Sequence, residues 1–83
     1  MPDDIELLKK KIIYKSSYRG IKELDIILRS FVNEYLNNLS VNDLNDLLIF
    51  LDNNDDDIFK FKQGIEDKNI KNNNISKLFK NYN

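Results

Sequence analysis

The sequence predicts an all-α domain, a compact bundle of about five short helices. Apolar residues recur at three- and four-residue intervals along most of the chain, which is the period of an amphipathic helix. No segment alternates apolar and polar residues for long, and two glycines and one proline supply too few turns for a multi-stranded sheet. A chain of 83 residues is sufficient for one modest core. We therefore expect residues 1–83 to form a single helical domain, with the stretch from about 66 to 83 less ordered.

The first two helices are expected on either side of a short break. Asp3 or Asp4 suits the cap of a first helix over about residues 4–16. The expected apolar stripe of this helix comprises Ile5, Leu8 and Ile12, broadened by Leu7 and Ile13. Serines and a glycine within residues 16–20 then interrupt the apolar pattern, because serine favours caps and glycine weakens a helix interior by about 1 kcal/mol. A second helix, the longest amphipathic segment, follows from about 19 or 20 to 37. Its expected apolar face comprises Ile21, Leu24, Ile27, Leu28, Phe31 and Tyr35.

Three shorter helices are expected in the second half. Ser40, with an acid three residues on, predicts the capped start of a third helix over about residues 41–51. An acid at 55, 56 or 57 is expected to cap a fourth helix that stops at Gly64. A fifth helix should begin after Glu66 and Asp67. The apolar anchors expected for these helices are Leu44, Leu47, Leu48, Leu51, Ile58, Phe59, Phe61, Ile70, Ile75, Leu78 and Phe79.

Composition excludes several classes of function. Thirteen basic and fourteen acidic side chains leave a net charge of -1, whereas nucleic-acid binders rely on a basic excess. The chain has no cysteine and no histidine, so disulfides and histidine-based metal or proton-transfer sites are excluded. No apolar run reaches the roughly 20 residues that span a bilayer, and the acidic N-terminus is unlike a signal peptide. We expect a cytoplasmic protein that is not an enzyme.

The acidic turn at residues 52–57 does not match a calcium loop. Counting from Asp52, the sixth position is Asp57 where glycine is required, and the twelfth is Gln63 where a bidentate glutamate is required. Helix capping accounts for these acids better, and we expect no metal site.

The most informative stretch has the form R-G-x-x-E-x-D at the start of the second helix. One interpretation is structural: Arg19 and Glu23, four residues apart, form a surface ion pair contributing about 0.3–0.5 kcal/mol, and Gly20 lets two helices approach. The other is functional: Gly20 clears space for a partner's backbone, while Arg19 offers five fixed donors to a partner's carboxylate or carbonyl groups. Tyr14 and Tyr18 flank the motif and are either core or contact residues.

The motif and the pattern after it resemble the succinate dehydrogenase flavinylation factors (SdhE type). The likeness covers roughly residues 7 to 64 and keeps both order and spacing. After Arg19-Gly20-Ile21-Lys22-Glu23 come Phe31, Tyr35, Leu44, Leu47-Leu48, Leu51-Asp52, Asp57-Ile58, Phe61 and Gly64. Three positions depart from the family's pattern. Tyr18 replaces a second arginine, Phe61 replaces a tryptophan, and the proline common after Gly64 is missing.

The resemblance implies a helical bundle that binds the flavoprotein subunit of succinate dehydrogenase or fumarate reductase. It also implies that the bundle promotes covalent attachment of FAD to a histidine of that subunit. FAD would be the partner's cofactor and would not be bound stably by this chain, which we expect to be a monomer. The residues that match the family's functional motif are Arg19, Gly20 and Glu23, with Asp25 at a less demanding position. These four residues, with Tyr14 and Tyr18, are the expected partner-binding residues.

Other classes of protein fit less well. A generic helical interaction module with an unrelated partner is the main alternative, and it predicts no effect on flavin attachment. A helix-turn-helix DNA binder would read bases with the helix after Ser40, but Asp43 and Asp46 would bring acids to the phosphates. An acyl carrier would require an Asp-Ser-Leu attachment site at a helix start, and the sequence has none.

Overall fold

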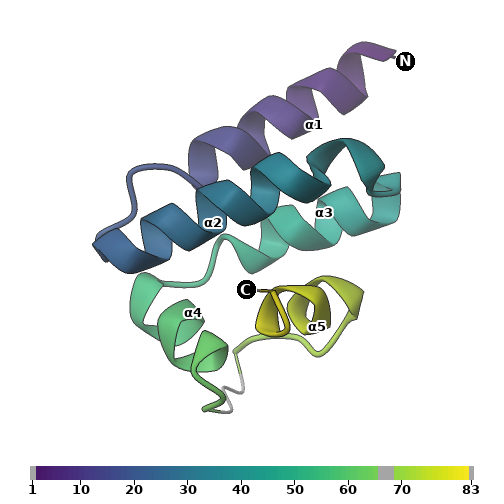
Figure 1. Cartoon of the computed structure of the whole chain (residues 1–83). Coiled ribbons are helices and arrows are strands. Elements are labelled where there is room, and N and C mark those ends of the chain that lie inside the picture. Colours follow the sequence, from purple (N-terminus) through teal and green to yellow (C-terminus); the bar gives the residue numbers. More distant parts are fainter. Residues whose placement is uncertain (1, 66–68, 83) are drawn as a thin grey trace.

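Five α-helices and one short 3₁₀ helix form two layers in this computed structural model, which describes residues 2–65 and 69–82. Figure 1 shows the first three α-helices together as one layer above the last two. The part of the chain that the structure describes contains no strand, so the predicted all-α bundle is confirmed. The elements are α1 (Pro2–Lys15), α2 (Lys22–Tyr35), η1 (Leu36–Asn38), α3 (Val41–Phe50), α4 (Asp55–Lys62) and α5 (Asn74–Lys80).

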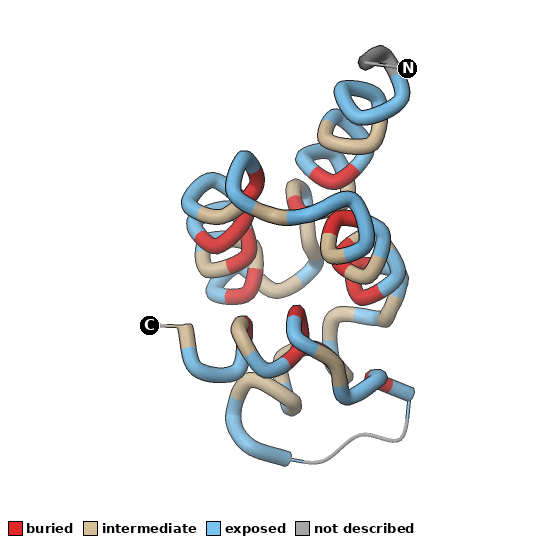
Figure 2. The backbone as a smooth tube through the Cα atoms, turned by 90° about the vertical axis from the view of Figure 1, so that its right-hand side faces the viewer, coloured by how far each residue is buried: buried red, intermediate tan, exposed pale blue. Residues whose placement is uncertain are grey.

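The core lies between the helices, and Figure 2 shows the buried stretches of each helix turned toward its neighbours. Phe31 of α2 is at the centre, with its ring 5.2 Å from Phe79 of α5 and 5.3 Å from Tyr82. Edge-to-face pairs of this kind stabilise by about 0.5–1.5 kcal/mol beyond their area. Tyr82 is not among the apolar anchors expected from the sequence. The buried apolar residues are Ile12, Leu24, Leu28, Phe31, Val32, Leu36, Leu44, Leu47, Phe50, Leu51, Ile58, Ile70, Ile75 and Phe79.

The first helix departs from expectation in its packing. Of its predicted apolar stripe, Ile12 is fully buried and Leu8 is partly buried, whereas Ile5, Leu7 and Ile13 are exposed. Figures 1 and 2 show the reason: the N-terminal half of α1 extends past the ends of the other helices. None of the helices in the described ranges has the length and apolarity that crossing a bilayer requires.

Helix caps confirm part of the predicted boundaries and correct the rest. Ser40 Oγ accepts from the Asp43 N–H at 3.2 Å, so the predicted cap of α3 is confirmed. The cap of α4 is Asn54, whose Oδ1 accepts from Asp57 N–H at 2.9 Å. The expectation that residue 55, 56 or 57 caps this helix is therefore wrong; these acids occupy its first turn, where the helix dipole favours negative charge. Gly64, at φ 95°, ends α4 as predicted.

The fifth helix begins later than expected. It starts at Asn74, and Asn73 and Ser76 form its capping box. Residues 66–68, where its start was predicted, lie outside the described residues, and residues 69–73 are not helical. The predicted anchors Ile75 and Phe79 are buried in the core, and α5 packs on α3 and α4.

Candidate functional site

The R-G motif lies in the connection between α1 and α2, residues 16–21, which we call the motif loop. Ser16 and Ser17 end α1 by donating their hydroxyls to the Ile13 carbonyl at 2.9 and 2.8 Å. Tyr18 then adopts φ 58°, in the left-handed region. A non-glycine residue in that region costs on the order of 1 kcal/mol and persists where the surroundings hold it. The second helix consequently begins at Lys22 and not at 19 or 20 as expected.

Arg19 is turned into the molecule. Its Nε donates to Asp55 Oδ1 at 2.6 Å. Its Nη1 donates to the carbonyls of Lys15 at 2.8 Å and Leu51 at 3.1 Å, and its Nη2 donates to the carbonyl of Asn53 at 3.0 Å. The side chain is only 11% exposed. One guanidinium therefore joins the end of α1, the turn after α3 and the start of α4.

This arrangement changes both interpretations of Arg19. The surface ion pair with Glu23 is wrong, because Arg19 precedes α2 and pairs with Asp55 instead. The presentation of its donors to a partner was also expected, but all three guanidinium nitrogens are engaged within the chain. We therefore assign Arg19 to the support of the motif loop.

Gly20 completes the same contact. Its backbone N–H donates to Asp55 Oδ2 at 2.5 Å. A Cβ at this position would lie 2.9 Å from that oxygen, closer than real Cβ contacts allow. The close approach predicted for Gly20 is thus made by a carboxylate of the same chain. We call the Asp55 carboxylate with Arg19 Nε and Gly20 N–H the Asp55 clamp.

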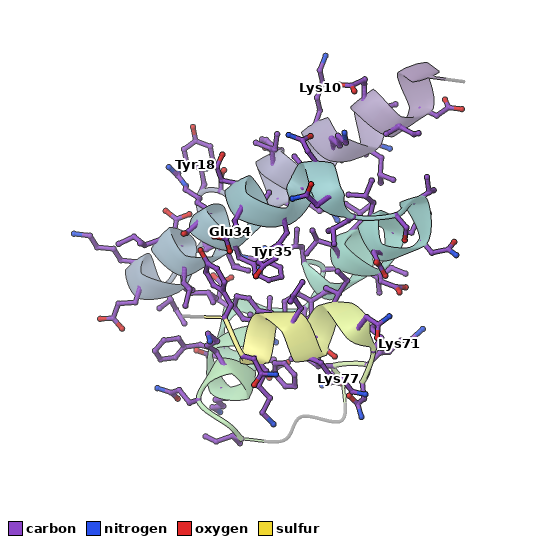
Figure 3. The ribbon with its side chains drawn as sticks, turned by 45° about the vertical axis from the view of Figure 1, so that its right-hand side comes forward. Lys10, Tyr18, Glu34, Tyr35, Lys71 and Lys77 are labelled. Carbon is purple, nitrogen blue, oxygen red and sulfur yellow. The ribbon has the colours of Figure 1, made fainter. Side chains whose placement is uncertain are left out.

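The two tyrosines beside the motif face solvent. Tyr18 is 83% exposed and Tyr14 is 74% exposed, so neither belongs to the core. Figure 3 shows Tyr18 projecting from the bundle beside α2. The Arg29 guanidinium lies 5.4 Å from the centre of the Tyr18 ring and pairs with Asp25 at 3.1 Å. Tyr18, Arg29 and Asp25 thus form one continuous chain of contacts on the surface.

The expected site residues are only partly brought together. Tyr14, Tyr18 and Arg19 line an open depression of about 420 Å³ that also includes Asp55. Asp25 is linked to this depression indirectly, because it pairs with Arg29, which in turn contacts the Tyr18 ring. Glu23 is exposed in the first turn of α2, and no ion pair in the described part of the chain joins it to the other site residues. Sequence reasoning treated Asp55 only as a possible helix cap and missed its contact with Arg19 and Gly20. The available signal was the asparagine before it, because Asn54 can cap α4 and leaves the Asp55 carboxylate available for another contact.

Two carboxylates of the acidic turn are engaged by neighbouring groups of the chain. Asp52 pairs with Lys15, and the Asp55 carboxylate is held by the clamp. Among the side chains that the structure describes, those of residues 4–65 and 69–82, no three acidic, histidine or cysteine groups gather closely enough to hold an ion.

Two pKa shifts lie elsewhere in the bundle. Burial, reinforced by Glu34, raises the pKa of Tyr35 at the end of α2. Burial lowers the pKa of Lys62, which donates to the carbonyls of Tyr82 and Lys80.

These features define a small all-α domain, in which a buried framework holds an exposed loop that carries Tyr18. The family model described as flavinator of succinate dehydrogenase matches residues 10–83. The chain belongs to this family. The match begins close to the point where α1 first buries a side chain, at Ile12.

Curated relatives agree with this assignment. The chain is 38% identical over 58 residues to succinate dehydrogenase assembly factor 2, mitochondrial, of Dictyostelium discoideum. It is 35% identical over 57 residues to the protein of the same name from Aspergillus flavus. The alignments include 70% and 69% of this chain, but only 41% and 20% of those relatives, so the chain spans less than half their length. No solved structure matches the chain at a significant level.

Proposed function

We propose that this chain is an assembly factor that binds the flavoprotein subunit of succinate dehydrogenase and promotes covalent attachment of FAD to it. The observation that carries the proposal is the R-G-x-x-E motif, which begins in the motif loop held by the Asp55 clamp and ends in the first turn of α2, in a chain that belongs to the flavinator family. The names of the curated relatives support the same role. FAD is then the partner's cofactor.

The mechanism that suits this chain is orientation of the partner. The sequence contains no histidine and no cysteine, so it offers neither of the usual nucleophiles or bases for work at neutral pH. The covalent link would join a histidine of the partner to the partner's flavin, and the flavin itself would supply the reactivity. Holding these groups in the productive geometry lowers a barrier by several kcal/mol without any chemical step on the helper.

The proposed contact surface comprises the exposed members of the expected site, Tyr14, Tyr18, Gly20 and Glu23, together with the partly buried Asp25. An exposed tyrosine gives a large contact area at low entropic cost, because its ring has only two rotatable bonds. Arg19 supports this surface from behind, since its three guanidinium nitrogens already make four hydrogen bonds within the chain.

The test is co-expression of the succinate dehydrogenase flavoprotein subunit with and without this chain. Covalent flavin is read as fluorescence of the subunit band after denaturing electrophoresis. Tyr18→Ala removes the exposed ring while leaving the core untouched. Val41→Ala is the matched control, because Val41 is 49% exposed and lies at the start of α3, beside the N-terminal half of α1. We expect fluorescence with the wild type and the control and a clear loss with Tyr18→Ala.

Unchanged fluorescence in the presence of the wild-type chain, with no complex formed, would reject the proposal in favour of a helical interaction module with another partner. The fumarate reductase flavoprotein, tested in parallel, identifies the client. We also propose a monomer in the cytoplasm; the relatives are named as mitochondrial, so fractionation of the native cells is the direct check.

A further inference from the structure

We propose that Asp55 is a positioning residue for the flavoprotein contact: its carboxylate holds the motif loop in the conformation that presents Tyr18. This inference rests on the proposed function and adds to it a residue from α4, outside the R-G-x-x-E motif. It also assigns Arg19 to the loop's framework. The inference is carried by the Asp55 clamp, by the strained backbone at Tyr18 and by the rigid attachment of α4.

The two carboxylate oxygens of Asp55 bind two consecutive residues. Oδ1 accepts from Arg19 Nε at 2.6 Å, and Oδ2 accepts from the Gly20 N–H at 2.5 Å. Both bonds are short, as expected when the acceptor is charged. One bond fixes a side chain and the other fixes the peptide unit between residues 19 and 20. Together they determine how the chain leaves Tyr18.

The backbone at Tyr18 requires such a restraint. Its φ of 58° is disfavoured for a tyrosine, so an unrestrained loop would relax toward extended conformations. That relaxation would move the ring away from the Arg29 guanidinium, which now lies 5.4 Å from its centre. The side chain is 83% exposed, so burial does not hold it. The hydrogen bonds at residues 19 and 20 restrain the backbone on its C-terminal side, as those of Ser17 do on its N-terminal side.

The clamp is anchored to a rigid element. Asp55 is the first residue of α4, which is capped by Asn54 and fixed to the core through the fully buried Ile58. Arg19 also binds the carbonyls of Leu51 and Asn53, in the turn that leads into α4. The Arg19 and Asp55 side chains are 11% and 26% exposed, so water competes weakly for the ion pair.

The experiment compares Asp55→Asn with Asp56→Asn in a reconstituted assay of flavoprotein subunit, FAD and full-length chain. The two variants make the same change of charge in the same helical turn, but Asp56 is exposed and has no part in the clamp. Covalent flavin is measured across a range of chain concentrations. Hydrogen exchange of the motif loop and far-UV circular dichroism are measured on the same samples.

For Asp55→Asn we expect a rise of about tenfold in the chain concentration that gives half-maximal covalent flavin. A rise of this size corresponds to about a tenth of the molecules having the motif loop in its binding-competent conformation. The maximal yield at saturation should be unchanged, because the exposed contact residues are still present. Exchange of amides 17–21 should accelerate while helicity stays at the wild-type level. Arg19→Lys, which keeps the charge but loses the guanidinium fork, should shift the half-maximal concentration in the same direction.

Three results would overturn the inference: equal concentration dependence for both asparagine variants, unchanged exchange of the loop in Asp55→Asn, or loss of helicity in that variant. The last would mean that Asp55 supports the fold and not the loop. Failure of the proposed function is distinguishable from all three, because the wild-type chain would then produce no covalent flavin.

Discussion

Replacement of Arg19 by alanine should lower the stability of the whole bundle, although this residue lies in a loop. The change removes the Nε bond to Asp55 and leaves the carbonyls of Lys15, Leu51 and Asn53 without their donor. Breaking a buried ion pair costs about 3–5 kcal/mol. Asp55 is 26% exposed and still accepts from the Gly20 N–H, so hydration and this hydrogen bond offset part of the cost. We expect Arg19→Ala to lower the free energy of unfolding by about 2–3 kcal/mol.

The chain itself offers a matched comparison. Arg29 pairs with Asp25 four residues away, but its side chain is 50% exposed. An exposed pair of this kind contributes about 0.3–0.5 kcal/mol, and its cation–π contact with Tyr18 adds about 0.5–1 kcal/mol. Arg29→Ala should therefore cost about 1 kcal/mol and Arg19→Ala two to three times as much.

Urea unfolding followed by far-UV circular dichroism measures both losses. A domain of 83 residues has a total stability of roughly 4–12 kcal/mol, so both variants should still fold at low temperature. The melting temperature of Arg19→Ala should fall by roughly 10–20 °C. Equal losses for the two arginine variants would refute the assignment of Arg19 to the framework. So would additive losses in the Arg19→Ala/Asp55→Ala double mutant, because residues in contact should couple.

Three further predictions concern other parts of the structure. Gly20→Ala places a Cβ 2.9 Å from Asp55 Oδ2 and should cost about 1 kcal/mol in urea unfolding, while Gly20→Arg should abolish flavin attachment and leave helicity largely intact. Phe79→Ala empties a fully buried site and should cost about 3–5 kcal/mol, measured in the same way. Burial and Glu34 raise the pKa of the Tyr35 hydroxyl above 10.0. The stability that this shift contributes is therefore complete below pH 10 and is lost as the pH rises through the raised pKa. Tyr35→Phe should flatten this pH dependence, measured by urea unfolding at a series of alkaline pH values.

Each of these predictions has a contrary outcome. Loss of helicity in Gly20→Arg would show that the glycine serves the fold alone. A loss below about 1 kcal/mol for Phe79→Ala would mean that α5 is only loosely joined to the core. An unchanged alkaline profile after Tyr35→Phe would assign the pH dependence to another group.

The bundle was predictable because its helices have regular apolar periods and its caps follow local rules. Ser40 was recognised since its partner is three residues away. The cap of α4 was assigned to an acid because asparagine and aspartate cap helices equally well, and only geometry distinguishes Asn54 from its neighbours. The start of α5 was placed too early because the capping box of Asn73 and Ser76 uses serine where glutamate is usual.

The site was less predictable, since its main contact is not local. Arg19 has an acid four residues away in Glu23, which the helical spacing favoured as partner, but its true partner is 36 residues along the chain. The left-handed backbone at Tyr18 shifts the start of α2 and removes the helical register on which that pairing depended. A single sequence contains no signal that pairs residue 19 with residue 55.

The two halves of the Asp55 clamp lie far apart along the chain, so the motif cannot adopt this conformation outside the folded domain. A synthetic peptide of residues 10–30 would contain every letter of R-G-x-x-E-x-D, yet it would lack Asp55 and the carbonyls of Leu51 and Asn53 that shape the loop. Such a peptide should compete poorly with the folded chain for the flavoprotein, and competition at equal concentration would show the motif to be self-sufficient. Grafting this activity onto another scaffold would require the turn before α4 together with the loop.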